Sequence, residues 1–200
     1  MVCSPTASGK TEAVVAPLVE RHLPPGTDGL PRLLLVSPTR ALVNDLLRRL
    51  EPPLARLGLA VHRRTGDHAT LDRRHPPQVL ITTPESLDSL LVRHTAFLAE
   101  VRAVVLDELQ ILDGSPRGDQ LRLLLGRLRT LVGERGAALQ AAASSATIHD
   151  PRGLAERYVE RADTIVVREE IGTRSGIVDK FRIVPLMHKR RLSSASTADA

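Results

Sequence analysis

Short apolar runs alternate along the chain with segments of helical periodicity, and this alternation restricts the fold more than any other feature of the sequence. The runs have the length of strands and most are apolar throughout; they cover 32–37, 59–63, 78–83, 102–107, 139–144 and 163–168. Strands that are buried on both faces of a parallel sheet have this appearance. We therefore predict a parallel sheet that is covered on both faces.

The segments between the runs indicate where helices lie and where they begin. Leucine and valine recur on one helical face in 41–57 and in 117–132. A capping side chain directly precedes a proline, shortly after a strand, at Ser37-Pro38, Thr83-Pro84 and Asp150-Pro151. A cap followed by proline at the first helical position starts a helix. Repeated strand, cap and helix imply right-handed crossovers and predict an α/β fold of three layers around a mostly parallel central sheet.

Composition narrows the class of protein. The chain has 200 residues, of which 42% are apolar and 26% charged, as is typical of a globular domain. The net charge of +5 comes mainly from arginine and suits a phosphate-rich partner, although charge alone favours ordinary solvated helix faces. The single cysteine, Cys3, excludes an internal disulfide and fits a reducing compartment.

The order of segments predicts the domain organisation. We expect one domain over 1–168 with its first strand reduced to the opening residues, a linker or extra strand over 169–187, and a disordered tail over 188–200. No apolar run is long enough to cross a membrane, and the start does not resemble a secretory signal. We therefore expect a cytoplasmic protein without a membrane partner.

The segment SPTASGKTEA, residues 4–13, matches much of the phosphate-loop pattern G-x-x-x-x-G-K-[ST], with Ser4 in place of the first glycine. Gly9 would let backbone N–H groups approach a phosphate, Lys10 would supply positive charge, and Thr11 would offer a hydroxyl to Mg²⁺. A helix that begins near Lys10 would point its positive end at the same anion. On this match alone, a polar turn that contains Gly-Lys-Thr by chance remains an alternative.

The segment VVLDELQ, residues 104–110, is an apolar strand that ends in two acids. A carboxylate at the end of a neighbouring strand is what a phosphate loop needs to hold Mg²⁺, and Asp107 has that position. Glu108 would orient or deprotonate the attacking water. The alternative is a strand that ends in a solvated acidic turn. Together, the loop and the acids predict a site that holds the phosphates of a nucleotide with Mg²⁺ and favours hydrolysis over transfer to a bound acceptor.

Five segments of the chain resemble, in order, motifs I, Ia, Ib, II and III of the superfamily 2 DEAD/DEAH-box helicases. They read SPTASGKTEA, VSPTRAL, TTPESL, VLDELQ and SSATIHDP. The segments HPPQVLITTPESL and GSPRGDQLRLLLGRL look closest to the large helicase-related branch. The resemblance covers residues 2–168 and implies the RecA-like, ATP-binding lobe of an ATP-dependent nucleic-acid helicase.

The resemblance also implies roles for the matching positions. Nucleotide contacts fall on Thr6, Ala7, Ser8, Gly9, Lys10, Thr11 and Glu12, metal ligation falls on Thr11 and Asp107, and catalysis falls on Lys10 and Glu108. Contacts with one nucleic-acid strand fall on Pro38, Thr39, Arg40, Gly66, Asp67, Thr83, Pro84 and Glu85. Coupling between the nucleotide and the strand falls on Gln110, Ser145 and Thr147.

Simpler structural roles stay open for several of these residues. Thr39 and Thr83 would serve equally well as helix caps, and both roles can hold at once. The hydroxyls of Ser145 and Thr147 could satisfy local backbone groups. A nucleotide-dependent nucleic-acid-binding or assembly module without useful turnover is the alternative function. A small-molecule kinase is disfavoured because the chain lacks an arginine-rich lid and the other motifs would be coincidences.

The chain departs from the family pattern in ways that affect the expected partners. Gln110 stands where such helicases usually carry His or Asp, and Glu85 stands where motif Ib usually has Gly. Motifs IV to VI, which include the arginine finger, have no counterpart after residue 168. We therefore expect a second RecA-like lobe or partner subunit, a nucleic-acid partner with DNA favoured over RNA, and poor ATP hydrolysis by this chain alone.

Overall fold

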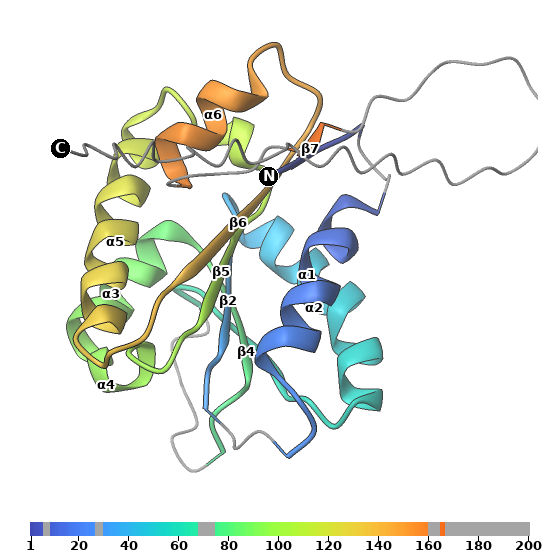
Figure 1. Cartoon of the computed structure of the whole chain (residues 1–200), viewed down its shortest axis with the longest axis vertical. Coiled ribbons are helices and arrows are strands. Elements are labelled where there is room, and N and C mark those ends of the chain that lie inside the picture. Colours follow the sequence, from blue (N-terminus) through green and yellow to red (C-terminus); the bar gives the residue numbers. More distant parts are fainter. Residues whose placement is uncertain (6–8, 27–29, 68–74, 160–164, 167–200) are drawn as a thin grey trace, which may run out of the picture.

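A parallel sheet forms the centre of the structure (Figure 1). This computed structural model describes residues 1–5, 9–26, 30–67, 75–159 and 165–166, and the structural statements below concern those residues. The strands are β1 Val2–Cys3, β2 Leu33–Val36, β3 Val61–Arg64, β4 Val79–Thr82, β5 Ala103–Leu106, β6 Gln140–Ser145 and β7 Ile165–Val166. Their order across the sheet is β3-β4-β2-β5-β6-β1-β7, and every neighbouring pair is parallel.

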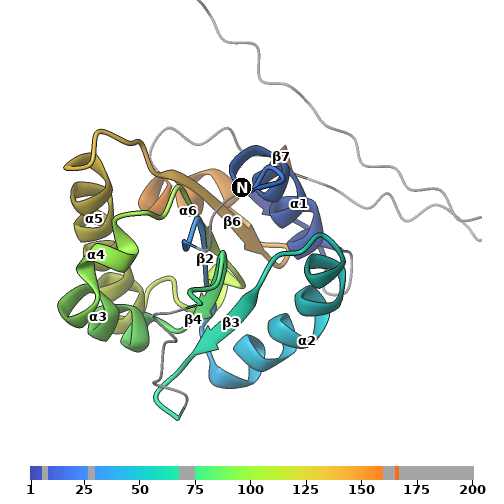
Figure 2. The same ribbon diagram turned by 90° about the horizontal axis from the view of Figure 1, so that it is seen from below.

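Helices cover both faces of this sheet (Figures 1 and 2). One face carries α1 Lys10–His22 and α2 Arg40–Arg56, and the other carries α3 Pro84–Arg93, α4 Thr95–Leu98, α5 Pro116–Gly133 and α6 Pro151–Tyr158. Side chains alternate along β2, so Leu33 and Leu35 pack with α1 and α2, while Leu34 and Val36 pack with the other helices. The predicted three-layer α/β fold with a parallel central sheet is confirmed.

Side-chain caps mark the starts of several helices. The Thr83 hydroxyl accepts a hydrogen bond from the Ser86 N–H at the start of α3, and the Asp150 carboxylate accepts one from the Gly153 N–H at the start of α6. Both helix starts follow the prediction. α5 begins in the same way, at a capping Ser115 followed by proline, which the sequence analysis did not single out.

The predicted helix start at Ser37-Pro38 is wrong. Thr39 is the cap of α2, where its hydroxyl accepts from the Leu42 N–H at 3.3 Å, and the helix begins at Arg40. Ser37 cannot begin the helix because its backbone is still part of the sheet and its N–H donates to the carbonyl of the last residue of β4 at 3.0 Å. The capping role that the sequence left open for Thr39 is thus confirmed, as it is for Thr83.

Other boundaries shift for local reasons. β3 begins at Val61 rather than at Leu59, because the Leu59 N–H donates to the Leu54 carbonyl at 3.0 Å and so closes the turn after α2. The linker or strand expected over 169–187 and the tail expected over 188–200 lie outside the described residues. Among the helices that the structure describes, none is both long enough and apolar enough to pass through a membrane.

Candidate nucleotide site and nucleic-acid cleft

The described residues between β1 and α1, Ser4, Pro5 and Gly9, lie at the carboxyl edge of the sheet. The Ser4 N–H donates to the Ser145 carbonyl at 3.2 Å, which anchors the start of the loop on β6. Gly9 has a φ of 75°, a left-handed conformation that glycine adopts without strain, and α1 begins at the next residue. Lys10 and Thr11 are only 5% and 3% exposed. The predicted nucleotide contacts Thr6, Ala7 and Ser8 lie outside the described residues.

The two acids that follow β5 meet this loop. Thr11 Oγ1 donates to Asp107 Oδ1 at 3.1 Å, although the two residues are 96 positions apart in the sequence. Lys10 Nζ lies 2.8 Å from Glu108 Oε1. Beyond this ion pair, the buried ammonium has no hydrogen-bond partner within the described part of the chain. The fold therefore brings together the side chains that the sequence assigns to phosphate and metal binding.

A buried serine that the sequence analysis missed completes the surroundings of Asp107. Ser144 Oγ donates to Asp107 Oδ1 at 2.6 Å, and both side chains are buried. Because side chains alternate along a strand, Ser144 and Ser145 point to opposite faces of β6. This alternation is the signal that could have separated the two serines and placed Ser144 on the side of the acids.

The two acids have opposite electrostatic environments. Burial raises the pKa of Asp107, with a further rise from the charge of Glu108, and the hydrogen bonds from Ser144 and Thr11 only partly oppose this. Burial also raises the pKa of Glu108, but Lys10 and a neighbouring amide outweigh burial, so the net shift is downward. Glu108 is therefore a stable carboxylate at neutral pH, whereas the fold disfavours the charge on Asp107.

The neighbouring amide belongs to Gln110, which connects the acidic turn with the end of β6. Its Nε2 donates to Glu108 Oε2 at 2.6 Å. Its Oε1 accepts from Ser145 Oγ at 2.8 Å and from the Ala146 N–H at 3.0 Å. Glu108 has a φ of 48°, which non-glycine residues rarely adopt. Two of the three predicted coupling residues thus share one network, whereas Thr147 is exposed and takes no part in it.

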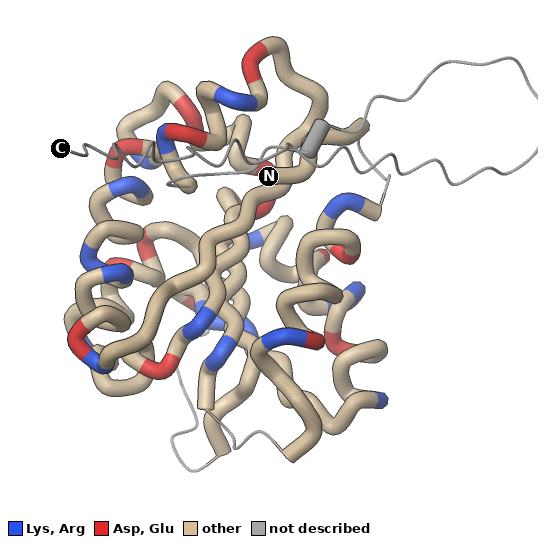
Figure 3. The backbone as a smooth tube through the Cα atoms, viewed as in Figure 1, with Lys and Arg blue, Asp and Glu red and all other residues tan. Residues whose placement is uncertain are grey.

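Charges on the helices are mostly paired. Figure 3 shows basic and acidic positions interspersed on both helical layers. Glu12, which the sequence assigns to the nucleotide, forms an ion pair with Arg49 of α2 at 2.8 Å. Further pairs join Arg48 with Asp45, Arg122 with Asp119, and Arg127 with Asp88. These pairs support solvated helix faces as the origin of much of the arginine content.

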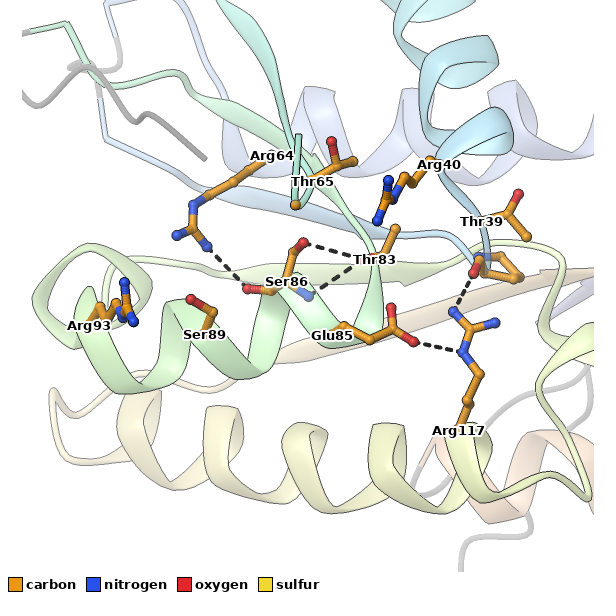
Figure 4. A pocket seen from close by; sticks show the side chains of 12 residues that line it. Thr39, Arg40, Arg64, Thr65, Thr83, Glu85, Ser86, Ser89, Arg93 and Arg117 are labelled. Carbon is orange, nitrogen blue, oxygen red and sulfur yellow. Dashed lines mark hydrogen bonds and ion pairs between the residues drawn. The ribbon is translucent and has the colours of Figure 1, made fainter. Parts of the chain in front are cut away.

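A cleft of about 540 Å³ lies between the ends of β3 and β4 and the helices α2, α3 and α5 (Figure 4). Most of the predicted strand contacts line it, namely Pro38, Thr39, Arg40, Gly66, Thr83 and Glu85. Asp67 does not line the cleft but accepts from Arg40 Nη1 at 2.6 Å, and Pro84 is the first residue of α3. The other lining residues were missed by sequence reasoning: Arg64, Thr65, Ser86, Ser89, Arg93 and Arg117.

Arg117 connects two turns at one end of this cleft. Its Nε donates to Glu85 Oε1 at 2.7 Å, and its Nη2 donates to the Pro38 carbonyl at 2.6 Å (Figure 4). Burial raises the pKa of Glu85, but the hydrogen bond from Arg117 helps to outweigh burial, so the net shift is downward. The first turn of α5 therefore fixes the starts of α2 and α3 relative to each other.

Known proteins share both the sequence and the fold of this chain. A profile of the DEAD/DEAH box helicase family matches residues 1–154. The ATP-dependent helicase Lhr-Core of Methanothermobacter thermautotrophicus is 35% identical over 170 residues, which cover 74% of this chain and 19% of that protein. The Lhr helicase/probable uracil glycosylase of Mycolicibacterium smegmatis is 34% identical over 188 residues, which cover 84% of this chain and 12% of that protein.

Solved structures agree with these matches. The structure of Mycobacterium smegmatis helicase Lhr bound to ssDNA and AMP-PNP superposes with a TM-score of 0.69 at 34% identity, covering 84% of this chain and 23% of that one. The DUF1998 helicase MrfA bound to DNA and AMPPNP gives a TM-score of 0.67 at 27% identity, covering 78% of this chain and 23% of that one. The chain thus spans less than a quarter of each of these proteins. Because the family profile covers most of its length, the chain belongs to the DEAD/DEAH box helicase family.

Proposed function

We propose that this chain is the ATP-binding and ATP-hydrolysing lobe of an ATP-dependent helicase or translocase that acts on nucleic acid, with DNA favoured over RNA. The observation that carries the proposal is the meeting of Lys10 and Thr11 with Asp107 and Glu108 at one edge of the sheet. The similarity to the helicase Lhr bound to ssDNA and AMP-PNP supports the proposed binding of a nucleotide and of a nucleic-acid strand.

The residues present fit a magnesium nucleotide. Asp107 and Thr11 offer adjacent oxygen ligands, which Mg²⁺ prefers, and phosphate and water oxygens would complete its coordination. In the described part of the chain, no cluster of three His, Cys, Asp or Glu side chains offers an all-protein metal site. When bound, Mg²⁺ supplies positive charge to the β and γ oxygens of ATP.

Lys10 has two competing partners in this scheme. Its ammonium is held by Glu108 in this structure, and a phosphate that binds at the loop must draw Lys10 away from that carboxylate. Loss of the ion pair would raise the pKa of Glu108, because Lys10 is what chiefly lowers it against burial. Nucleotide binding would therefore both release Glu108 and make it a better base for the attacking water.

The strand would lie in the cleft beside the nucleotide site. The N-termini of α2 and α3 border this cleft and carry partial positive charge, which favours phosphate groups. A second RecA-like lobe or partner subunit would supply an arginine that compensates charge in the transition state. We therefore expect this chain alone to bind ATP well but to hydrolyse it slowly and not to unwind a duplex.

The second candidate is a module that binds nucleotide and nucleic acid without turnover. It is favoured by one observation: Lys10 and Glu108, the two groups assigned to catalysis, neutralise each other in this structure. Both candidates predict nucleotide binding, so the test must separate binding from hydrolysis.

The test measures the melting temperature with and without Mg-ATP, together with phosphate release. Mg-ATP should raise the melting temperature of the wild-type chain, by an amount that corresponds to about 2.7 kcal/mol at a hundred times Kd. Lys10→Ala should remove this rise. Glu108→Gln should abolish turnover yet keep or tighten nucleotide binding, because it frees Lys10.

Glu51→Gln, an exposed glutamate on α2, makes the same chemical change as a control and should behave as wild type. A Lys10→Ala chain that keeps the full rise in melting temperature would overturn the nucleotide site. If Glu108→Gln leaves the measured phosphate release unchanged, the binding module is the better description.

A further inference from the structure

One arginine ties together two turns that border the cleft. Arg117 is the second residue of α5, and its side chain lines the cleft (Figure 4). Its Nε donates to Glu85 Oε1 at 2.7 Å, and its Nη2 donates to the Pro38 carbonyl at 2.6 Å. A single guanidinium from α5 therefore holds both the turn that precedes α2 and the first turn of α3.

The two acceptors are far apart in the sequence and differ in chemistry. Arg117 lies 32 positions from Glu85 and 79 positions from Pro38. A planar guanidinium presents its N–H groups in several fixed directions, so one arginine can hold a carboxylate and a carbonyl at the same time. The bridge therefore fixes where two separate turns lie relative to α5.

Stability alone does not account for this bridge. The side chains of Arg117 and Glu85 are 42% and 52% exposed, and an ion pair with that exposure contributes little to the free energy of unfolding. The turn from which Arg117 extends is itself well anchored. Ser115 Oγ donates to the Leu112 carbonyl at 2.6 Å and accepts from the Gly118 N–H at 3.2 Å. A weak ion pair on an anchored turn is better suited to set a separation than to hold the fold together.

The separation of the two turns matters for a ligand that contacts both. Pro38, Thr39 and Glu85 border the cleft at these turns. The phosphates of one strand follow each other at a spacing that its own backbone sets, and contacts to phosphates determine how a protein lies on nucleic acid. A cleft whose borders already have the matching separation loses less free energy on binding than one that must first be ordered. Arg117 can therefore strengthen strand binding without contacting the strand.

We propose that Arg117 is a positioning residue for the nucleic-acid strand: by holding Glu85 and the Pro38 carbonyl, it keeps two borders of the cleft at the separation that a single strand requires. The proposal rests on the proposed function, because it deepens the strand-binding part of it. Two other roles make different predictions. In one, Arg117 contacts a phosphate directly, and Glu85 competes with the strand for the guanidinium. In the other, the bridge is a surface ion pair with no effect on the strand.

The test is a titration of a fluorescent single-stranded oligothymidylate by anisotropy, with the full chain, at several salt concentrations and at a temperature where melting curves show every variant to be folded. Arg117→Gln should bind the strand about tenfold more weakly, the effect of losing about one hydrogen bond to a charged group. The slope of log K against log salt should stay that of wild type, because no phosphate contact is lost. A direct contact predicts instead a slope that is shallower by about 0.7.

Glu85→Ala separates the same two roles by the sign of its effect. If Arg117 positions the turns, loss of the carboxylate breaks half of the bridge, and the strand should bind several-fold more weakly. The double variant should then bind no more weakly than Arg117→Gln, because both changes disrupt one unit. If Arg117 contacts a phosphate directly, Glu85→Ala removes a competitor and the strand should bind more tightly, which would overturn the positioning role.

Arg122→Gln is the matched control. It removes the same charge from an exposed arginine of the same helix, which is likewise paired with an acid but does not line the cleft. If the wild-type chain binds the strand and Arg117→Gln binds it as well as this control does, the positioning role is wrong while the proposed function stands. If the wild-type chain does not bind the strand at all, the positioning role falls together with the strand-binding part of the proposed function, whereas the nucleotide site is judged by its own assay.

Discussion

At the scale of single residues, the adjacent acids show how environment divides similar side chains. Asp107 is buried between two hydroxyl donors, whereas Glu108 faces an ammonium. Their pKa values shift in opposite directions, and such a divergence commonly separates the tasks of paired carboxylates. Here the difference in pKa fits Asp107 as a ligand for a cation and Glu108 as a base. The strength of that base depends on whether Lys10 contacts it.

Ser144 offers a test at this scale. Ser144→Ala removes a hydrogen bond of 2.6 Å to a buried carboxylate, so among the described residues Thr11 remains as the side-chain donor to Asp107. We expect the free energy of unfolding to fall by about 1–3 kcal/mol, as for other hydrogen bonds to buried charged groups. The Mg²⁺ concentration needed for half-maximal ATP binding should rise several-fold, which a nucleotide titration at increasing Mg²⁺ would measure.

Ser145→Ala is the control for that prediction, because the Ser145 hydroxyl contacts Gln110 rather than Asp107. It should leave the Mg²⁺ dependence of ATP binding close to that of wild type. Equal Mg²⁺ dependence in the two variants would contradict a role for Ser144 in orienting Asp107.

At the scale of elements, the sequence correctly predicts those helix starts that depend on residues within a single turn. The starts of α3 and α6 follow from a capping residue before proline, because both signals act within one turn. The same pair fails at Ser37, whose N–H is still engaged by the neighbouring strand, a contact that local sequence does not reveal.

The residues of the candidate site likewise fall into those that the sequence could predict and those that it could not. The sequence could predict that Lys10 and Asp107 lie close together. Lys10 belongs to a recognisable motif, Asp107 follows a strand, and the carboxyl ends of parallel strands share one edge. Arg93 and Arg117 could not be predicted, because they reach the cleft from opposite ends of different helices. Only the packing of α3 against α5 brings those helices together.

The junction of α5 and α6 allows a test at this scale. Gly118 lies in the first turn of α5, and a Cβ built there would be 2.2 Å from the Leu112 carbonyl oxygen and 2.5 Å from the Tyr158 hydroxyl. Gly118→Ala should therefore lower the free energy of unfolding by about 1–3 kcal/mol, the usual cost of overpacking. Urea denaturation would measure the change.

Gly126→Ala provides the opposite expectation within the same helix. A Cβ at Gly126 meets no atom within 4 Å, and alanine has the higher helix propensity, so this variant should gain about 0.5–1 kcal/mol. The two changes are chemically identical, and a similar effect in both would show that Leu112 and Tyr158 do not pack as closely on α5 as the structure indicates.

At the scale of the whole molecule, the parallel sheet gathers the residues of the proposed nucleotide site at one edge. The loop after β1, the acids after β5 and the serines of β6 all lie at carboxyl ends of neighbouring strands. The opposite edge carries structural contacts instead, such as the ion pairs of Arg32 and Arg102 with Glu100. A ligand that binds at the carboxyl edge should therefore protect backbone amides at that edge more than amides at the opposite edge.

Hydrogen exchange can measure this difference. Mg-ATP should slow the amide exchange of 9–12, 107–110 and 144–146, and it should leave the fast-exchanging amides near Arg32 and Arg102 unchanged. Fast amides are the informative ones, because they exchange by local opening, whereas core amides slow whenever a ligand raises global stability. Lys10→Ala should lose the protection at the carboxyl edge. Protection that appears at the opposite edge instead would mean that the nucleotide binds elsewhere, and the meeting of Lys10 with Glu108 would then be only a structural ion pair.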